Sequence, residues 1–189
     1  MTDNFQLIES LISFDEPNCF YIAHIICRRK DNPHLSKNSE IIKEFSFFSL
    51  EEFQKHTDKI KSICIEKNAR AYFNLNSRDA SKVSLLMMKR LAELVLSKSY
   101  KSISNLYSNV VGECHQSNDP TWIIDVDDAT KLEEVRSVIT KERADSVVAV
   151  IPTKNGAHLI SRPFNLNKLA DKLHGFDIHK NNPTILFCP

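Results

Sequence analysis

The pattern of apolar and polar residues along the first half of the chain predicts two strands and a short helix. Residues 20 to 27 and 41 to 48 are rich in β-branched and aromatic side chains, and the polar loop between them contains Pro33. We therefore expect these two strands to form a long hairpin. Apolar residues at helical spacing predict a short helix over residues 3 to 13, before the hairpin.

A helix start follows the hairpin. Ser49 and Glu52 have the spacing of a capping box, which predicts a helix over residues 50 to 67. Residues 70 to 75 then read as a short strand, and residues 76 to 79 as a polar turn.

The next predicted helix has a one-sided apolar stripe, which is typical of a helix that packs on a core. A short helix and a polar loop are expected over residues 99 to 120. The residues of the stripe are Val83, Leu86, Met87, Leu91, Leu94 and Val95.

The second half shows a clearer order of strand, helix, strand, strand, helix and strand. This βαββαβ order predicts an RRM-like, or ferredoxin-like, sheet with helices on one face. The chain is thus expected to be mixed α/β, of the α+β class, with an N-terminal α/β lobe (residues 1 to 115) packed on this sheet (residues 116 to 189). The predicted elements cover residues 122 to 127, 129 to 142, 146 to 151, 157 to 162, 165 to 174 and 184 to 188.

Composition narrows the class of protein without identifying a function. The 189 residues are 42% hydrophobic and 26% charged, which is ordinary for a soluble globular protein. No apolar run is long enough to span a membrane, and no secretory signal is indicated. The five cysteines form no C-x-x-C pair, which favours free thiols in a reducing cytoplasm. A net charge of +1 neither requires nor excludes a nucleic-acid partner.

Candidate chemistry begins where the apolar strand at residues 122 to 127 runs into carboxylates. Asp125 and Asp127 are two residues apart, so both side chains point to the same face of a strand. Two neighbouring carboxylates repel each other unless a cation lies between them, and their oxygens suit Mg²⁺ or Mn²⁺. The alternative is that Asp127 or Asp128 caps the helix that follows, and Asp128 is the better candidate for that role.

Two further polar positions follow in order along the chain. Gly156 permits positive φ and suits a tight hairpin, and His158 then projects from the start of the returning strand. Asp177 lies between two apolar residues shortly before the last strand. Each has a structural alternative, since a lone histidine near a turn is usually a hydrogen-bonded surface residue and Asp177 would cap the turn at residues 181 to 183.

The three positions together resemble a known set of motifs. A hydrophobic-Asp-x-Asp sequence, a Gly-x-His 33 residues after Asp125, and a hydrophobic-Asp before a final strand resemble the motifs of the archaeo-eukaryotic primase superfamily. The resemblance covers residues 121 to 189. Asn155 and Gly156 stand where the family has a glycine pair, and residues 180 to 183 replace the glycines of its third motif.

The resemblance implies an RRM-like palm that binds divalent metal ions for nucleotidyl transfer. Mg²⁺ or Mn²⁺ would be held by Asp125, Asp127 and Asp177. His158 would contact the triphosphate of the incoming nucleotide, and the basic residues expected near the phosphates are Lys154, Arg162 and Arg78.

Three hypotheses for function remain at this point. The first is a small primase-polymerase that uses nucleoside triphosphates on single-stranded DNA or a primer-template, with a helicase or another replication protein acting in trans. The second is a non-catalytic binder of nucleotides or single-stranded nucleic acid on the same palm. The third, a metal-dependent nuclease with an RRM-like sheet, requires two neighbouring histidines, and only His158 lies in a suitable predicted strand.

Overall fold

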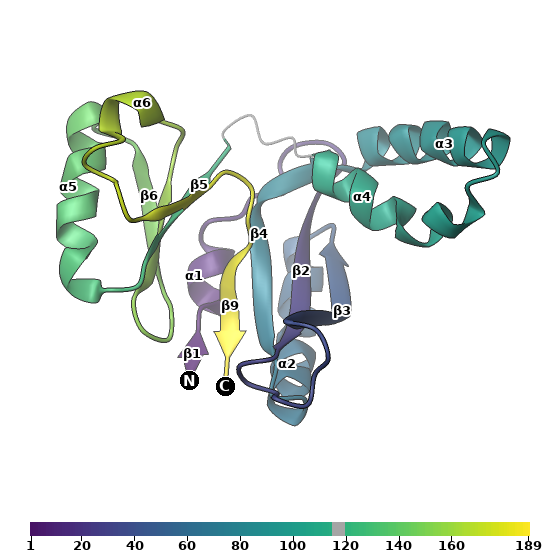
Figure 1. Cartoon of the computed structure of the whole chain (residues 1–189), viewed down its shortest axis with the longest axis horizontal. Coiled ribbons are helices and arrows are strands. Elements are labelled where there is room, and N and C mark those ends of the chain that lie inside the picture. The colour runs from purple at the N-terminus through teal and green to yellow at the C-terminus, as the bar shows by residue number, and fades with distance from the viewer. Residues whose placement is uncertain (115–119) are drawn as a thin grey trace.

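Two antiparallel β-sheets organise the part of the chain that the structure describes, residues 1 to 114 and 120 to 189 of a computed structural model (Figure 1). The α+β class expected from the sequence is confirmed. Across the first sheet the strands are β1 (Thr2–Asp3), β9 (Thr184–Cys188), β4 (Arg70–Asp79), β2 (Cys19–Arg28) and β3 (Ser39–Phe47). Across the second they are β6 (Val147–Pro152), β7 (Ala157–Ser161), β5 (Trp122–Val126) and β8 (Asp177–His179).

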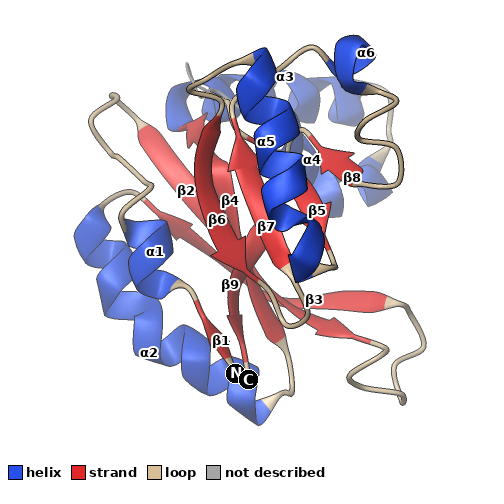
Figure 2. Cartoon of the chain, turned by 90° about the vertical axis from the view of Figure 1, so that its left-hand side faces the viewer, coloured by secondary structure: helices blue, strands red, loops and turns tan. Residues whose placement is uncertain are grey.

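An aromatic core holds the first sheet against α1 (Phe5–Glu9) and α2 (Leu50–Glu66), which cover one of its faces (Figure 2). The rings of Phe47, Phe53 and Phe73 are fully buried and lie within 5.3 to 6.1 Å of one another, centroid to centroid. Each such aromatic side chain removes a large apolar area from water, so this cluster is a major source of the sheet's stability.

The capping box predicted at the start of α2 is confirmed. Oγ of Ser49 accepts a hydrogen bond from the backbone N–H of Glu52 at 3.2 Å. The carboxylate of Glu52 in turn accepts one from the backbone N–H of Phe48 at 2.7 Å. Both bonds satisfy donors at the helix start that would otherwise lack partners.

A second, aliphatic core lies between the second sheet and its two helices, α5 (Leu132–Glu142) and α6 (Leu166–Leu169). Alternate residues of β5 and β7, among them Ile124 and Leu159, point to this side and are fully buried. A 3₁₀ turn over Ala129–Lys131 leads into α5. The carboxylate of Asp128 accepts from the backbone N–H of Thr130 at 3.0 Å, which fits its predicted role as a helix cap.

The last strand does not join the second sheet, contrary to expectation. β9 pairs with β4 on one side and β1 on the other, in the first sheet. β9 is an apolar segment between two other strands of the larger sheet, and all five of its residues are buried. Burial of these apolar side chains favours this interior position. The fourth place in the second sheet is taken by the short strand β8, which the sequence pattern did not predict. The second half of the chain therefore supplies a strand to the first sheet.

The two sheets also share side chains along a common seam. Ile123, Ile151 and Ile160 of the second sheet belong to the same buried cluster as the phenylalanines of the first. The amide of Asn4 donates to the backbone carbonyls of Pro152 in β6 and Ile185 in β9, at 2.9 and 3.0 Å. These contacts hold one sheet edge against the other.

Strand β4 runs four residues further than predicted, through the segment expected to be a polar turn. Asn76 in this extension is buried and donates to the carbonyls of Thr121 and Lys180 at 3.0 and 3.3 Å. It also accepts from the backbone N–H of Thr121 at 2.7 Å. The first sheet thereby holds the segments that enter β5 and leave β8. The polar side chains of the extension can lie in a strand because hydrogen bonds to these distant segments satisfy them.

A helical arm projects from the end of β4 (Figure 1). It comprises α3 (Ala80–Leu96), a 3₁₀ helix (Tyr100–Asn105) and α4 (Leu106–Glu113). Val83 packs with Leu106 and Val110 in a small third core, and three members of the predicted stripe are partly buried beside it. The prediction was wrong for Leu91 and Val95, which are exposed.

The described helices include none that is both long enough and apolar enough to cross a membrane. The five cysteines of the chain are free.

Candidate functional site

A polar cleft lies between the two sheets, where the ends of β2, β4, β5 and the β6–β7 turn approach one another. One wall carries acidic residues and a histidine from the second sheet, and the other carries basic residues from the first sheet. The residues that line it are Arg28, Lys30, Arg70, Tyr72, Asp125, Asp127, Thr153, Lys154, Asn155, His158, Ile185 and Cys188.

Strand register brings Asp125, His158 and Asp177 into one row. Asp125 lies directly opposite His158 on β7 and directly opposite Asp177 on β8. Residues directly opposite each other in antiparallel strands share a face, so all three side chains project toward the cleft side of the sheet. Asp177 is exposed at the edge of this row and is not part of the cleft lining, whereas Asp127 extends from the end of β5 into the cleft.

The imidazole of His158 is held from two sides. Its Nδ1 forms a 2.8 Å hydrogen bond with Oγ1 of Thr184, a fully buried residue of β9. Its Nε2 lies 3.7 Å from Oδ1 of Asp125. Burial lowers the pKa of His158, while the negative charges of Asp125 and Asp127 oppose that effect and nearby His179 adds to it.

A neutral His158 can present an unprotonated nitrogen to the carboxylate of Asp125. When Nδ1 donates its proton to Thr184, Nε2 presents a lone pair toward the carboxylate oxygen of Asp125. Two acceptors facing each other at this distance are stabilised by a cation or a proton placed near both. The pair is thus arranged to share a positively charged group.

Gly156 is required here for a different reason from the one expected. Its φ is not positive, so the turn does not need glycine for its backbone conformation. A Cβ at this position would instead lie 2.0 Å from the backbone oxygen of Val126 and 2.8 Å from that of Asp127. The β6–β7 turn therefore rests directly on the chain that carries Asp125 and Asp127, and only glycine allows this approach.

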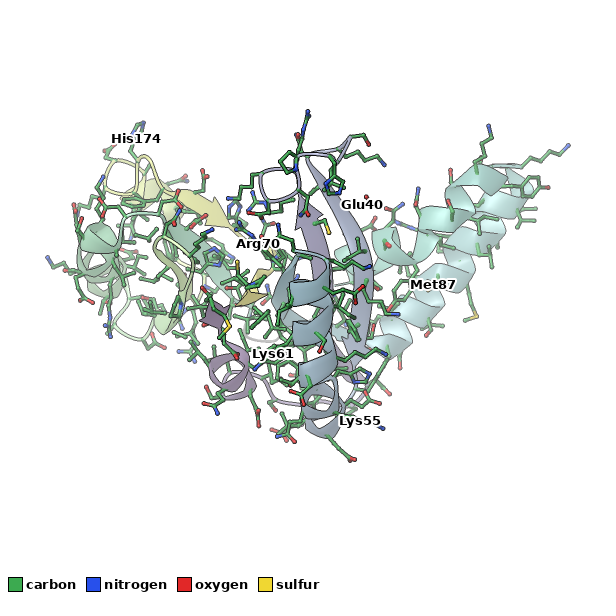
Figure 3. The ribbon with its side chains drawn as sticks, turned by 90° about the horizontal axis from the view of Figure 1, so that it is seen from below. Glu40, Lys55, Lys61, Arg70, Met87 and His174 are labelled. Atoms are coloured by element: carbon green, nitrogen blue, oxygen red, sulfur yellow. The ribbon has the colours of Figure 1, made fainter. Side chains whose placement is uncertain are left out.

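The basic wall was not predicted as part of the site. An Nη of Arg28 donates to the hydroxyl of Tyr72 at 3.4 Å. Arg70, which lies centrally between the two sheets (Figure 3), has its Nη2 2.7 Å from Oδ1 of Asp31. Lys30 completes the wall from the turn after β2.

The ion pair between Asp31 and Arg70 is only partly satisfied. Oδ2 of Asp31 and Nε of Arg70 are buried and have no hydrogen-bond partner among the described residues. Burial by itself would raise the pKa of Asp31, but the hydrogen bond and charge of Arg70 more than offset this and lower it. The side chain of Arg70 is about nine-tenths buried and lines the cleft, while its unpaired Nε lies below the surface.

The structure separates the other predicted basic residues. Lys154 is exposed in the β6–β7 turn and lines the cleft. Arg162 follows β7, four residues beyond His158, and its Nη1 bonds both the carboxylate and the backbone carbonyl of Asp145. Four residues of strand span about 13 Å, so Arg162 lies at the other end of the sheet.

Arg78 has a structural role instead of the predicted contact with phosphates. It is buried at the base of the helical arm and donates to the backbone carbonyls of Val111, Asn76 and Ser77. Burial lowers its pKa. The prediction placed Arg78 in a polar turn, whereas it belongs to the extended β4, which turns its guanidinium into the protein.

Asp125 and Asp127 fit a hard divalent cation by the chemistry of their donor atoms. Both present carboxylate oxygens to the same cleft, which is the ligand type that Mg²⁺ and Mn²⁺ prefer. Three such side chains do not converge on one point anywhere in residues 1 to 114 and 120 to 189. Two protein carboxylates with water or phosphate oxygens are, however, a common set for Mg²⁺.

Sequence reasoning identified one wall of the cleft and missed the other. The run of basic residues from Arg28 to Lys30 at the end of a strand was the available signal for the second wall. Arg70, Tyr72 and Thr184 carried no local signal, because only strand pairing brings them to the acids. His179 on β8 is a second histidine near His158, which the predicted strands did not include.

The comparisons with known proteins add no relative. The chain matches no protein-family model, no curated protein and no solved structure.

Proposed function

We propose that the protein is a metal-dependent nucleotidyltransferase of primase-polymerase type, which builds nucleic-acid chains from nucleoside triphosphates. The observation that carries this proposal is the pairing of opposite walls in one cleft. Carboxylates that suit a divalent cation face basic side chains that suit a polyphosphate. A nucleoside triphosphate with its metal ion carries both charges, so it complements both walls.

The connection of the second sheet supports an RRM-like palm. Its strands are ordered β6-β7-β5-β8, all neighbours are antiparallel, and helices follow β5 and β7. In this βαββαβ arrangement β8 is the last strand, in place of the segment at residues 184 to 188. The helices cover one face, which leaves the face of Asp125 and His158 available to the cleft.

In this proposal Asp125 and Asp127 hold Mg²⁺ or Mn²⁺, and Asp177, which lies opposite Asp125 on β8 but outside the cleft lining, is not a ligand. The bound metal would supply activation of the attacking hydroxyl and charge stabilisation at the phosphates. Gly156 keeps the two aspartates in place, because the turn on which it lies rests against their backbone.

The phosphates lie, in this proposal, between His158 and the basic wall. Nδ1 of His158 is anchored on Thr184, so its Nε2 points in a fixed direction beside Asp125; in the tautomer in which Nδ1 accepts from Oγ1 of Thr184, Nε2–H donates to a phosphate oxygen. Lys154, Arg28 and Arg70 surround the same space and stabilise negative charge on the phosphate oxygens.

Partners follow from this chemistry. Single-stranded DNA or a primer-template would supply the growing chain, and a helicase or another replication protein would act in trans. Free cysteines support a cytoplasmic localisation in this proposal, because the cytoplasm keeps thiols reduced.

The test is incorporation of labelled nucleotides on single-stranded DNA and on a primer-template, with Mg²⁺ or Mn²⁺. We expect metal-dependent extension by the wild-type protein. In Asp125→Asn the rate of nucleotide incorporation should fall about a hundredfold or more. Asp128→Ser is the matched control, because it removes a neighbouring carboxylate outside the cleft and keeps a capping oxygen. Full activity in Asp125→Asn would overturn the proposal.

The second candidate is a nucleotide or single-strand binder without catalysis on the same fold. It is favoured by the lack of three converging metal ligands in the described residues. Nucleotide binding that is independent of metal, with no incorporation on any template, would favour it over the first.

A further inference from the structure

The helical arm carries a second apolar surface that the protein itself does not cover. On α3, Leu85 and Met88 are 63% and 62% exposed, and Val95 and Leu96 are exposed in the last turn. At about 100° per helical residue, these positions lie on the side of α3 opposite Val83, which packs against Leu106 and Val110 of α4. We refer to Leu85, Met88, Ala92, Val95 and Leu96 as the outer stripe.

The outer stripe has the spacing of a helix-pairing seam. Leu85, Met88, Ala92 and Val95 follow one another at intervals of three, four and three residues. This is the heptad pattern that places successive side chains along one side of a helix for a partner helix. Ala92 in the middle leaves space for close approach, and the stripe spans about 16 Å.

The helical arm carries more basic than acidic side chains. Residues 80 to 113, which the structure describes in full, contain five basic and two acidic side chains. Both acidic side chains already belong to ion pairs, Glu93 with Lys89 and Glu113 with Arg90. Since the whole chain has a net charge of only +1, the basic excess is concentrated on the arm.

Two lysines mark the edge of the stripe itself. Lys82 and Lys89 are seven residues apart and therefore lie along one edge of the stripe, where a coiled coil carries its charged residues. In an antiparallel pair of two copies, these edges would face each other and like charges would repel. This argues against a second copy of the chain as the occupant.

We propose that the outer stripe of α3 is a docking site for an amphipathic helix of another protein, with an apolar seam flanked by acidic residues. The partner's apolar residues cover Leu85, Met88 and Val95, and its carboxylates pair with Lys82 and compete with Glu93 for Lys89. The proposal is independent of the chemistry in the cleft.

A defined peptide tests the recognition. The probe is a fluorescent three-heptad peptide with leucine and isoleucine along the seam and glutamate at both edges, titrated with the full chain while fluorescence anisotropy is recorded. Its counterpart carries lysine in place of glutamate. We expect the acidic peptide to bind, and the basic one to bind at least about tenfold more weakly. Equal affinity for both peptides, or no binding of the acidic peptide, would overturn the proposal.

Surface variants locate the site on the protein. Leu85→Glu combined with Met88→Glu is expected to abolish binding of the acidic peptide, whereas Ile65→Glu on α2 retains it. Ile65 is 62% exposed and therefore a matched control for a charge placed on an exposed apolar position. Lys82→Glu combined with Lys89→Glu should reverse the preference toward the basic peptide. Binding that survives the Leu85 and Met88 changes would contradict the assigned site.

Other occupants give different results. A dimer in analytical ultracentrifugation that the Leu85 and Met88 changes dissolve would assign the stripe to a second copy, and so overturn the proposal. Binding to anionic lipid vesicles through the stripe, without peptide binding, would do the same in favour of a membrane surface. Nucleotide incorporation on a bare template should be unchanged in these variants, which separates this test from that of the proposed function.

Discussion

The two sheets bury their helix-facing sides in a similar way and differ in what they present to each other. The first has an aromatic core under α1 and α2, and the second an aliphatic core under α5 and α6. Across the cleft, the first sheet presents Arg28 and Arg70, and the second presents Asp125 and Asp127. If the cleft binds a metal–nucleotide complex as proposed, neither sheet forms the site alone, because a ligand that carries both charges contacts both walls.

The contact between the turn of Gly156 and the backbone of β5 should be the most sensitive point of the acidic wall. Gly156→Ala places a methyl group against the backbone oxygen of Val126, so we expect unfolding free energy to fall by about 3 kcal/mol. Nucleotide incorporation should fall with it, because Asp125 and Asp127 shift.

Chemical denaturation measures the effect of Gly156→Ala, and Gly112→Ala is the control. A Cβ on Gly112 in α4 meets no atom within 4 Å, so alanine should stabilise the protein by about 0.5 kcal/mol. An unchanged stability in Gly156→Ala would show that the turn does not support the acidic wall.

Removal of charge from the basic wall tests whether it serves the same ligand. Arg28→Ala combined with Lys30→Ala should lower kcat/KM for the nucleoside triphosphate about a hundredfold, mostly through KM. Lys55→Ala combined with Lys59→Ala removes the same net charge from α2, far from the cleft, and should have little effect. Equal effects of the two double variants would reduce the basic wall to general electrostatics.

The ion pair behind the basic wall should matter for stability. Asp31→Asn leaves the guanidinium of Arg70 buried without its carboxylate, and we expect a loss of about 2 kcal/mol in unfolding free energy. Thermal or urea unfolding measures this loss. Asp145→Asn, which removes the charge of an exposed carboxylate paired with Arg143 and Arg162, should change the midpoint far less. Similar midpoints for both variants would contradict the buried character of the first pair.

The smallest expected effect is the pH dependence that His158 adds. Its pKa lies below the ordinary 6.5 in the folded protein, so the unfolded chain takes up a proton first as pH falls. Stability is therefore complete above about pH 6.5 and is lost below it. His158→Gln should flatten this part of the curve of unfolding free energy against pH, while His34→Gln, at an exposed position, should not. Identical curves for wild type and His158→Gln would refute the role of burial.

Local signals in the sequence predicted the elements better than their assembly. Ser49 and Glu52 marked the start of α2 because a capping box acts over four residues. The two-residue spacing of Asp125 and Asp127 likewise predicted that both side chains point to one side, and both line the cleft. By contrast, the pairing of β9 with β4 depends on residues more than a hundred positions apart, and no local pattern encodes it.

The same limit explains the candidate site. Asp125, Asp127, His158 and Lys154 lie in two nearby segments, so a motif captured them. The predicted position of Arg78 was wrong because hydrogen bonds from Asn76 to Thr121 and Lys180, far along the chain, stabilise a polar segment as a strand. The basic wall was missed because its residues reach the acids only through sheet pairing.

In the proposed function, both walls of the cleft bind one metal–nucleotide complex. The direct measurement is broadening of backbone amide NMR signals by paramagnetic Mn²⁺, added with a non-hydrolysable nucleoside triphosphate. We predict that signals of Val126, Gly156 and His158 disappear while those of α3 persist, and that Asp125→Asn prevents the effect. Broadening centred elsewhere, or unchanged in Asp125→Asn, would contradict the account.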